Sequence, residues 1–132
     1  MNNLNKNSTK EFYPNDVLRC ERKGNIKKGY WPSGNLEYIF EYSDNTQTIH
    51  KYKKITTYFD NSKQIKEYEC NLIDGKKNGY EYWYYPNGNP KWEISFIEGQ
   101  KDGIEYEYDT KGIKYECKWA NGNRITKMTL SK

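Results

Sequence analysis

Long apolar runs are missing from this 132-residue sequence, and so is any stretch with convincing helical periodicity. No segment has the pattern of a secretory signal or of a transmembrane span, so we expect a cytoplasmic protein. Hydrophobic residues supply 34% of the chain and charged residues 30%, a balance that ordinarily suggests disorder. The aromatic content of 17% argues against disorder, because Tyr and Trp bury large areas while keeping a polar group.

Histidine and cysteine are also scarce. His50 is the single histidine and lies in a polar stretch, which favours a surface position over a metal ligand. The three cysteines, Cys20, Cys70 and Cys117, cannot all pair, so we interpret them as small buried hydrophobes in a reducing compartment. No P-loop, His-Glu-x-x-His, Gly-x-Ser-x-Gly or Rossmann glycine pattern occurs. The sequence therefore predicts no enzyme, no cofactor and no metal site.

What the sequence does contain is a repeat of about two dozen residues. Its clearest copy is GYEYWYYPNG at residues 79–88, followed by KWEISFIEG at residues 91–99. A weaker copy follows over residues 103–122, and Gly79 and Gly103 are 24 residues apart. A fixed period of this size predicts an array, and arrays usually present surfaces to partners.

Looser copies of the turn extend the pattern towards the N-terminus, at residues 12–16, 30–34 and 58–62. We therefore assign residues 12–125 to one repeat domain, residues 1–11 to a flexible tail and residues 126–132 to a strand end or tail. Some positions depart from the repeat. Asp16 and Ser62 replace the glycine of the first turn, Asn45 replaces that of the second, and residues 46–54 have no counterpart.

Each unit has the pattern of a β-hairpin, because apolar and polar residues alternate on both sides of a turn signal. Pro86-Asn87-Gly88 is such a turn, and it predicts a positive φ at Gly88. We expect an all-β fold: an antiparallel meander of β-hairpin repeats forming an elongated, twisted sheet with one aromatic face. A closed small barrel is the alternative. The residues assigned to the buried side are Tyr82, Tyr84, Trp92, Ile94, Phe96, Tyr106, Tyr108, Tyr115 and Trp119.

Candidate partner-binding residues are the aromatic side chains that alternation places on the other side. Trp83 and Tyr85 fall there beside Glu81, and Phe59 and Trp31 occupy the position of Tyr85 in their own units. Trp and Tyr are common interface anchors, but such a ladder can equally pack against the neighbouring hairpin. Regularly placed carboxylates add Glu105 and Glu107 to the candidate surface, although cross-strand charge pairing also explains them.

The segment from Gly79 to Gly103 resembles the bacterial MORN-variant repeat. The residues that carry the resemblance are Tyr84, Tyr85, Pro86, Asn87, Gly88, Lys91, Glu93, Phe96, Gly99 and Gly103. Several bacterial proteins of this type belong to the YwqK-like antitoxin family, whose members are immunity proteins paired with polymorphic toxins. The resemblance implies a MORN-like hairpin fold and a cognate toxin domain as the protein partner.

The leading functional hypothesis is thus a non-catalytic protein-binding module, an immunity protein that occludes a toxin. Single-stranded nucleic-acid binding is the alternative, because aromatic strands with interleaved lysines can stack bases. The net charge of +4 is small and interspersed, and the basic residues 51–54 are too few for a phosphate-binding signature. A scaffold associated with membrane or cell-surface assemblies, and a homodimer formed through open sheet edges, also remain as hypotheses.

Overall fold

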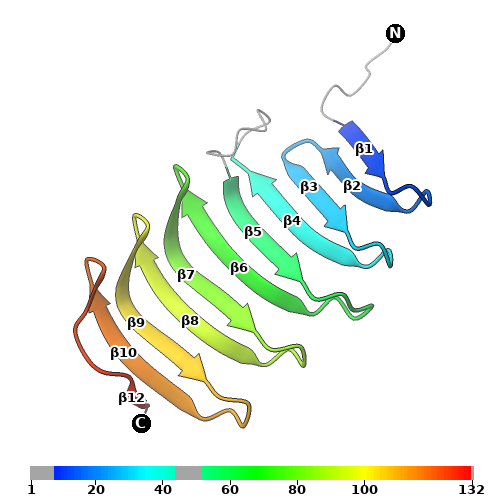
Figure 1. Cartoon of the computed structure of the whole chain (residues 1–132). Helices are drawn as coiled ribbons and strands as arrows, with labels where there is room; N and C mark the ends of the chain where they lie inside the picture. Colours follow the sequence, from blue (N-terminus) through cyan, green and yellow to red (C-terminus); the bar gives the residue numbers. More distant parts are fainter. Residues whose placement is uncertain (1–7, 44–51, 132) are drawn as a thin grey trace.

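The computed structural model describes residues 8–43 and 52–131, so His50 and Asn45 lie outside the described residues. Apart from turns, the described chain consists of β-strands (Figure 1). Their bounds are β1 Ser8–Phe12, β2 Leu18–Lys23, β3 Ile26–Tyr30, β4 Leu36–Tyr42, β5 Tyr52–Tyr58, β6 Lys66–Ile73, β7 Lys76–Tyr84, β8 Pro90–Ile97, β9 Gln100–Tyr108, β10 Lys114–Ala120, β11 Asn123–Arg124 and β12 Thr129–Leu130.

All of these strands form one sheet in which each strand from β1 to β11 pairs with the next along the chain. The pairing is antiparallel throughout, and β12 pairs with the edge of β10 that faces away from β9. Figure 1 shows the result as an elongated, twisted single layer with β1 and β12 at opposite ends. The predicted all-β hairpin meander is confirmed. The described strands do not close into a barrel, because β1 pairs with β2 alone among them and lies at the opposite end from β10.

The long turns are built as the sequence predicted. Gly88 has a φ of 89°, and its N–H donates to the carbonyl of Tyr85 at 2.8 Å. In the third unit the turn is longer, and Gln64 takes the positive φ, at 55°, in place of Ser62. The short turns after β6, β8 and β10 place two consecutive residues at positive φ, as at Asp74 and Gly75, which is the type I′ geometry that matches the twist of a hairpin.

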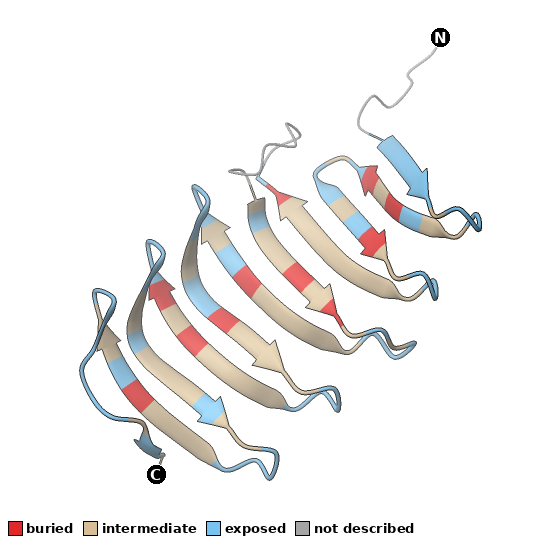
Figure 2. Ribbon diagram, in the orientation of Figure 1, coloured by how far each residue is buried: buried red, intermediate tan, exposed pale blue. Residues whose placement is uncertain are grey.

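The two sides of the sheet differ in packing. Residues directly opposite each other across antiparallel strands share a side, so the register traces continuous rows. Figure 2 shows that the buried residues are spread along the strands of the sheet. We call the side that holds most of their side chains the core face. Its central row, running from β2 to β10, is Arg22, Lys27, Phe40, Ile55, Cys70, Glu81, Ile94, Glu105 and Cys117.

The register corrects the predicted distribution of aromatic residues. Trp83 lies opposite Trp92 and therefore on the core face. Tyr82 pairs with Glu93, and Glu93 pairs with Tyr106, which puts these tyrosines on the other side, the outer face. Tyr84 and Tyr108 lie two residues further along β7 and β9, and therefore on the same side as Tyr82 and Tyr106. The prediction that Tyr82, Tyr84, Tyr106 and Tyr108 lie with Trp92, and that Trp83 and Glu81 lie opposite it, was wrong.

A β-bulge between Trp83 and Tyr84 is the reason for part of this error. Next to the turn Tyr84 pairs with Pro90, and a regular ladder continued from there would set Tyr82 opposite Trp92. The bulge shifts the pairing by one residue, which exchanges the two sides of β7 relative to β8. Similar register shifts precede the turns that follow β1, β3 and β5.

Both ends of the described chain are paired into the sheet. Residues 8–11, assigned to the tail, belong to β1 and pair with β2. At the other end the segment after Ala120 folds back along β10. Ile125 N–H donates to the carbonyl of Lys118 at 2.8 Å, and Lys118 N–H donates to Thr126 Oγ1 at 2.8 Å. This segment thus covers the edge of β10.

Candidate functional site

The predicted aromatic ladder lies along the long turns and links neighbouring hairpins. Tyr85 Oη donates to the carbonyl of Tyr108 at 2.8 Å, and Trp31 Nε1 donates to the carbonyl of Tyr58 at 3.3 Å. Tyr13 makes the same kind of bond to Tyr30, at 2.8 Å. Phe59 holds the same turn position, is half-buried and has no polar atom to donate. These contacts support the interpretation that the ladder packs against the next hairpin.

Glu81 is an internal counter-ion of the core face. Only 4% of the residue is exposed. Its carboxylate accepts from Tyr68 Oη at 2.7 Å and from Trp83 Nε1 at 3.0 Å, and it forms an ion pair with Lys77. Burial alone would raise the pKa of this carboxyl, but the bonds from Lys77, Tyr68 and Trp83 lower it below its ordinary value. A partner has no direct access to this group.

The same arrangement recurs one repeat later at Glu105. Its carboxylate accepts from Trp119 Nε1 at 2.6 Å, and Lys101 Nζ lies 3.3 Å from it. Lys101 also lies over the Trp119 ring, 4.5 Å from its centroid. Glu107, the next carboxylate on this face, is exposed. Of the predicted acidic positions, then, Glu81 and Glu105 stabilise the sheet internally, and Glu107 is free to meet a partner.

The outer face holds a row that the sequence reading missed. Across β6 to β10 the directly facing residues alternate between acid and aromatic: Glu69, Tyr82, Glu93, Tyr106 and Glu116. We call these residues the Glu-Tyr row. The spacing of the three glutamates, 24 and 23 residues, matches that of the turn glycines and was the available signal. The tyrosine rings of β7 stack beside this row, with centroids 5.8 Å apart for Tyr80 and Tyr82, and Tyr80 is 43% exposed.

Hydroxyl groups and lysines hold the Glu-Tyr row in place. Tyr84 Oη donates to Glu69 at 2.8 Å and Tyr108 Oη donates to Glu93 at 3.2 Å. Lys114 Nζ lies 3.9 Å from the centroid of the Tyr106 ring, a cation–π contact on this face. Glu69 forms ion pairs with lysines, whereas no ion pair involves Glu93 within residues 8–43 and 52–131. The row therefore presents partly uncompensated acid between aromatic rings.

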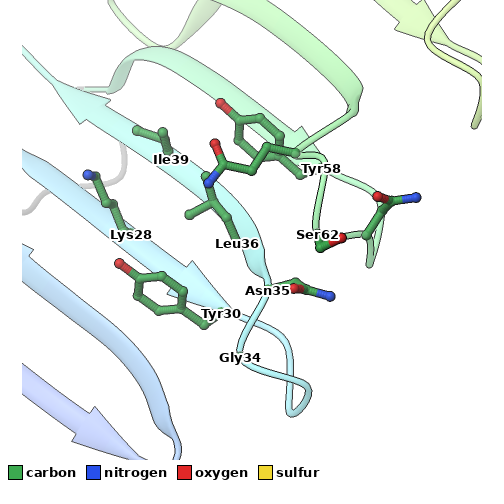
Figure 3. A pocket seen from close by; sticks show the side chains of 10 residues that line it. Lys28, Tyr30, Gly34, Asn35, Leu36, Ile39, Tyr58 and Ser62 are labelled. Atoms are coloured by element: carbon green, nitrogen blue, oxygen red, sulfur yellow. The ribbon is translucent and has the colours of Figure 1, made fainter.

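A hollow of about 290 Å³ lies on the same face further towards the N-terminus, beside the irregular third turn. Figure 3 shows Lys28, Tyr30, Asn35 and Tyr58 among its walls. Tyr30 Oη donates to Glu21 at 2.7 Å, and burial together with this bond raises the pKa of Tyr30 to about 12. The hollow is lined by an ammonium group, hydroxyls, amides and short apolar walls, a lining suited to a polar side chain of a partner.

Other predicted features are also placed. Cys20, Cys70 and Cys117 are free thiols and all buried, as expected, and burial raises the pKa of each. In the part of the chain that the structure describes, no three His, Cys, Asp or Glu side chains gather in a way that would hold a metal ion. Within those same residues, no helix is long and apolar enough to cross a membrane.

Comparison with known proteins adds no family assignment. No protein-family model matches the chain, and no curated protein matches it either.

Proposed function

We propose that this chain is a non-catalytic protein-binding repeat module, an immunity protein that neutralises a cognate toxin domain in the cytoplasm by direct binding. The observation that carries the proposal is the Glu-Tyr row, an acidic and aromatic surface on the open outer face. The resemblance of residues 79–103 to the MORN-variant repeat of YwqK-like antitoxins supports it as well.

The physical argument concerns what the outer face offers to a partner. Tyrosine supplies large contact area with few rotatable bonds, so fixing it on binding costs little conformational entropy. The rings of Tyr80, Tyr82 and Tyr84 are already stacked, at interplanar angles of 25°. The surface is thus ordered before the partner arrives, which preserves binding free energy.

Charge favours a basic partner surface. Glu93 lies between Tyr82 and Tyr106 without an ion pair in the described part of the chain. A toxin that acts on nucleic acid or nucleotides carries basic residues around its substrate cleft, and this row complements such a cleft and accelerates association. Binding of single-stranded nucleic acid is disfavoured on this face, because the carboxylates between the rings repel phosphate.

The test begins with whether the neighbouring gene encodes a toxin domain, and its readout is protection of cells that express that domain. We expect Tyr82→Ala combined with Glu93→Lys to abolish protection and to weaken binding at least tenfold, as measured by calorimetry. Glu98→Lys is the matched control, because Glu98 is an exposed turn residue outside the row and its substitution changes charge equally.

Circular dichroism and thermal melting serve as the control that each variant is folded. Normal protection by a folded Tyr82/Glu93 variant would remove the row from the interface. A loss of protection confined to Trp83→Ala with Tyr85→Ala would instead place the interface on the residues first predicted from the sequence. Retention of single-stranded nucleic acid at physiological salt, without any toxin partner, would favour the alternative function.

A further inference from the structure

Arg22 is an anomaly of the core face. Only 2% of the residue is exposed, and its guanidinium lies 4.2 Å from the centroid of the Tyr42 ring. Nε donates to the carbonyl of Gly24 at 3.0 Å. Both terminal nitrogens, Nη1 and Nη2, are buried and have no hydrogen-bond partner among the described residues. Buried polar groups of proteins are nearly always satisfied, and a buried charge needs a counter-charge.

The residue that faces Arg22 on β3 adds a second uncompensated positive charge. Arg22 lies directly opposite Lys27, so two cations share the core face. In the central row Lys27 on β3 holds the place that Glu81 holds on β7 and Glu105 holds on β9. Those glutamates each have a lysine partner in their own strand. The N-terminal repeat thus reverses the sign of the charge at this position, and within the described residues neither Arg22 nor Lys27 forms an ion pair.

The other groups around the cluster are donors or are engaged elsewhere. Tyr52 Oη lies 3.5 Å from Tyr42 Oη, and burial together with that contact raises the pKa of Tyr52 to about 12, so the hydroxyl keeps its proton. On the adjoining strand, the Glu11 carboxylate accepts a hydrogen bond from the Cys20 thiol at 3.5 Å. The position opposite Arg22 on β1 is Thr9, which has no charge. Among the described residues, Glu11 is therefore the carboxylate nearest in register to Arg22 on this face; it lies opposite Cys20, bonds to that thiol and makes no ion pair with the guanidinium.

We propose that Arg22 and Lys27 form a binding site for a small oxyanion, a phosphate or a carboxylate group. A guanidinium presents its two terminal N–H groups as a fork that matches two oxygens of one anion. An anion between Arg22 and Lys27 satisfies both Nη atoms and separates the two positive charges. Lys27 is half-buried, so the site meets solvent on the lysine side. This inference does not depend on the proposed toxin partner.

Thermal unfolding in different sodium salts at equal ionic strength tests the site. An anion that binds the folded state and not the unfolded state raises Tm by mass action. We expect phosphate or acetate, at roughly ten times Kd, to raise the Tm of the wild-type protein above its value in chloride by about 3–6 °C. Arg22→Met and Lys27→Met should remove this rise. Lys28→Met is the matched control, since Lys28 is the adjacent lysine on the opposite face and should retain the rise.

The comparison of phosphate with acetate separates the two ligand sources. A rise in phosphate alone indicates a free phosphate or phosphoryl group, and a rise in acetate indicates a carboxylate. No rise in the wild-type protein, or an equal rise in all variants, would overturn the proposal and leave only general ion effects. If either variant fails to fold, a shift of the Arg22 Nε–H resonance of the wild-type protein on addition of phosphate or acetate, absent with chloride, carries the test.

Discussion

Removing the Glu81 carboxylate should strongly destabilise the C-terminal hairpins. Glu81→Ala leaves the hydroxyl of Tyr68, the indole N–H of Trp83 and the ammonium of Lys77 without their shared acceptor. It also opens a gap in the central row between Cys70 and Ile94, both of which are buried. The substitution therefore combines an unpaired charge, two unsatisfied donors and lost packing.

The magnitude follows from these parts. Breaking a buried ion pair by removing one partner costs about 3–5 kcal/mol. The Lys77 side chain is 39% exposed, so its ammonium recovers part of its hydration, and we lower the expected loss to about 3 kcal/mol. Glu81→Gln keeps an acceptor for Tyr68 and Trp83 but loses the charge, so about half of that loss is expected.

Urea unfolding followed by circular dichroism measures the effect. With an m-value of about 2 kcal/mol/M, a loss of 3 kcal/mol lowers the midpoint by about 1.5 M. Glu107→Ala is the control, because Glu107 is an exposed carboxylate on the same face, and its removal should change stability by less than about 0.5 kcal/mol. Equal midpoints for Glu81→Ala and Glu107→Ala would refute the view that the core-face network stabilises the sheet.

Two further predictions concern a turn and the tyrosines. Gly88→Val should destabilise the protein by about 1 kcal/mol or more, because a β-branched residue resists the φ of 89° found there, and unchanged melting would contradict this. Burial raises the pKa of both Tyr30 and Tyr52 from 10.0 to about 12. The unfolded chain therefore loses these protons first, so stability is complete below pH 10.0 and is lost as the pH rises towards 12. A urea midpoint that stays constant across this range would show that the hydroxyls are not protected by folding.

Much of the fold follows from local signals in the sequence. Alternation within strands and the Pro86-Asn87-Gly88 turn predicted the hairpins, because both depend on residues close together in the chain. The relation between strands was harder to predict. The bulge before Tyr84 changes which residues of β7 and β8 share a side, and neither residue type nor period reveals it.

The candidate site shows the same limit. The turn positions of Trp31 and Tyr85 were recognised, but their hydrogen bonds to the next hairpin depend on how neighbouring units stack. Alternation along the strand set Glu81 on the side opposite Tyr82 and Tyr84, which was taken as the exposed side, whereas the register places it between buried side chains. The Glu-Tyr row joins residues from five strands, so only the complete ladder brings it together.

The cover over β10 has a consequence for how copies of this chain can associate. Edge-to-edge growth into a fibre needs two open strand edges on every copy. Among the described strands one edge is covered by the segment that follows Ala120, and β1 is left as the open one. If two copies paired through their β1 strands about a two-fold axis at the strand midpoint, Lys10 of one copy would face Lys10 of the other. Like charges directly opposite each other are destabilising, so this dimer is also disfavoured. The segment after Ala120 therefore prevents another copy from pairing with β10. The sheet does not extend beyond the strands of a single chain.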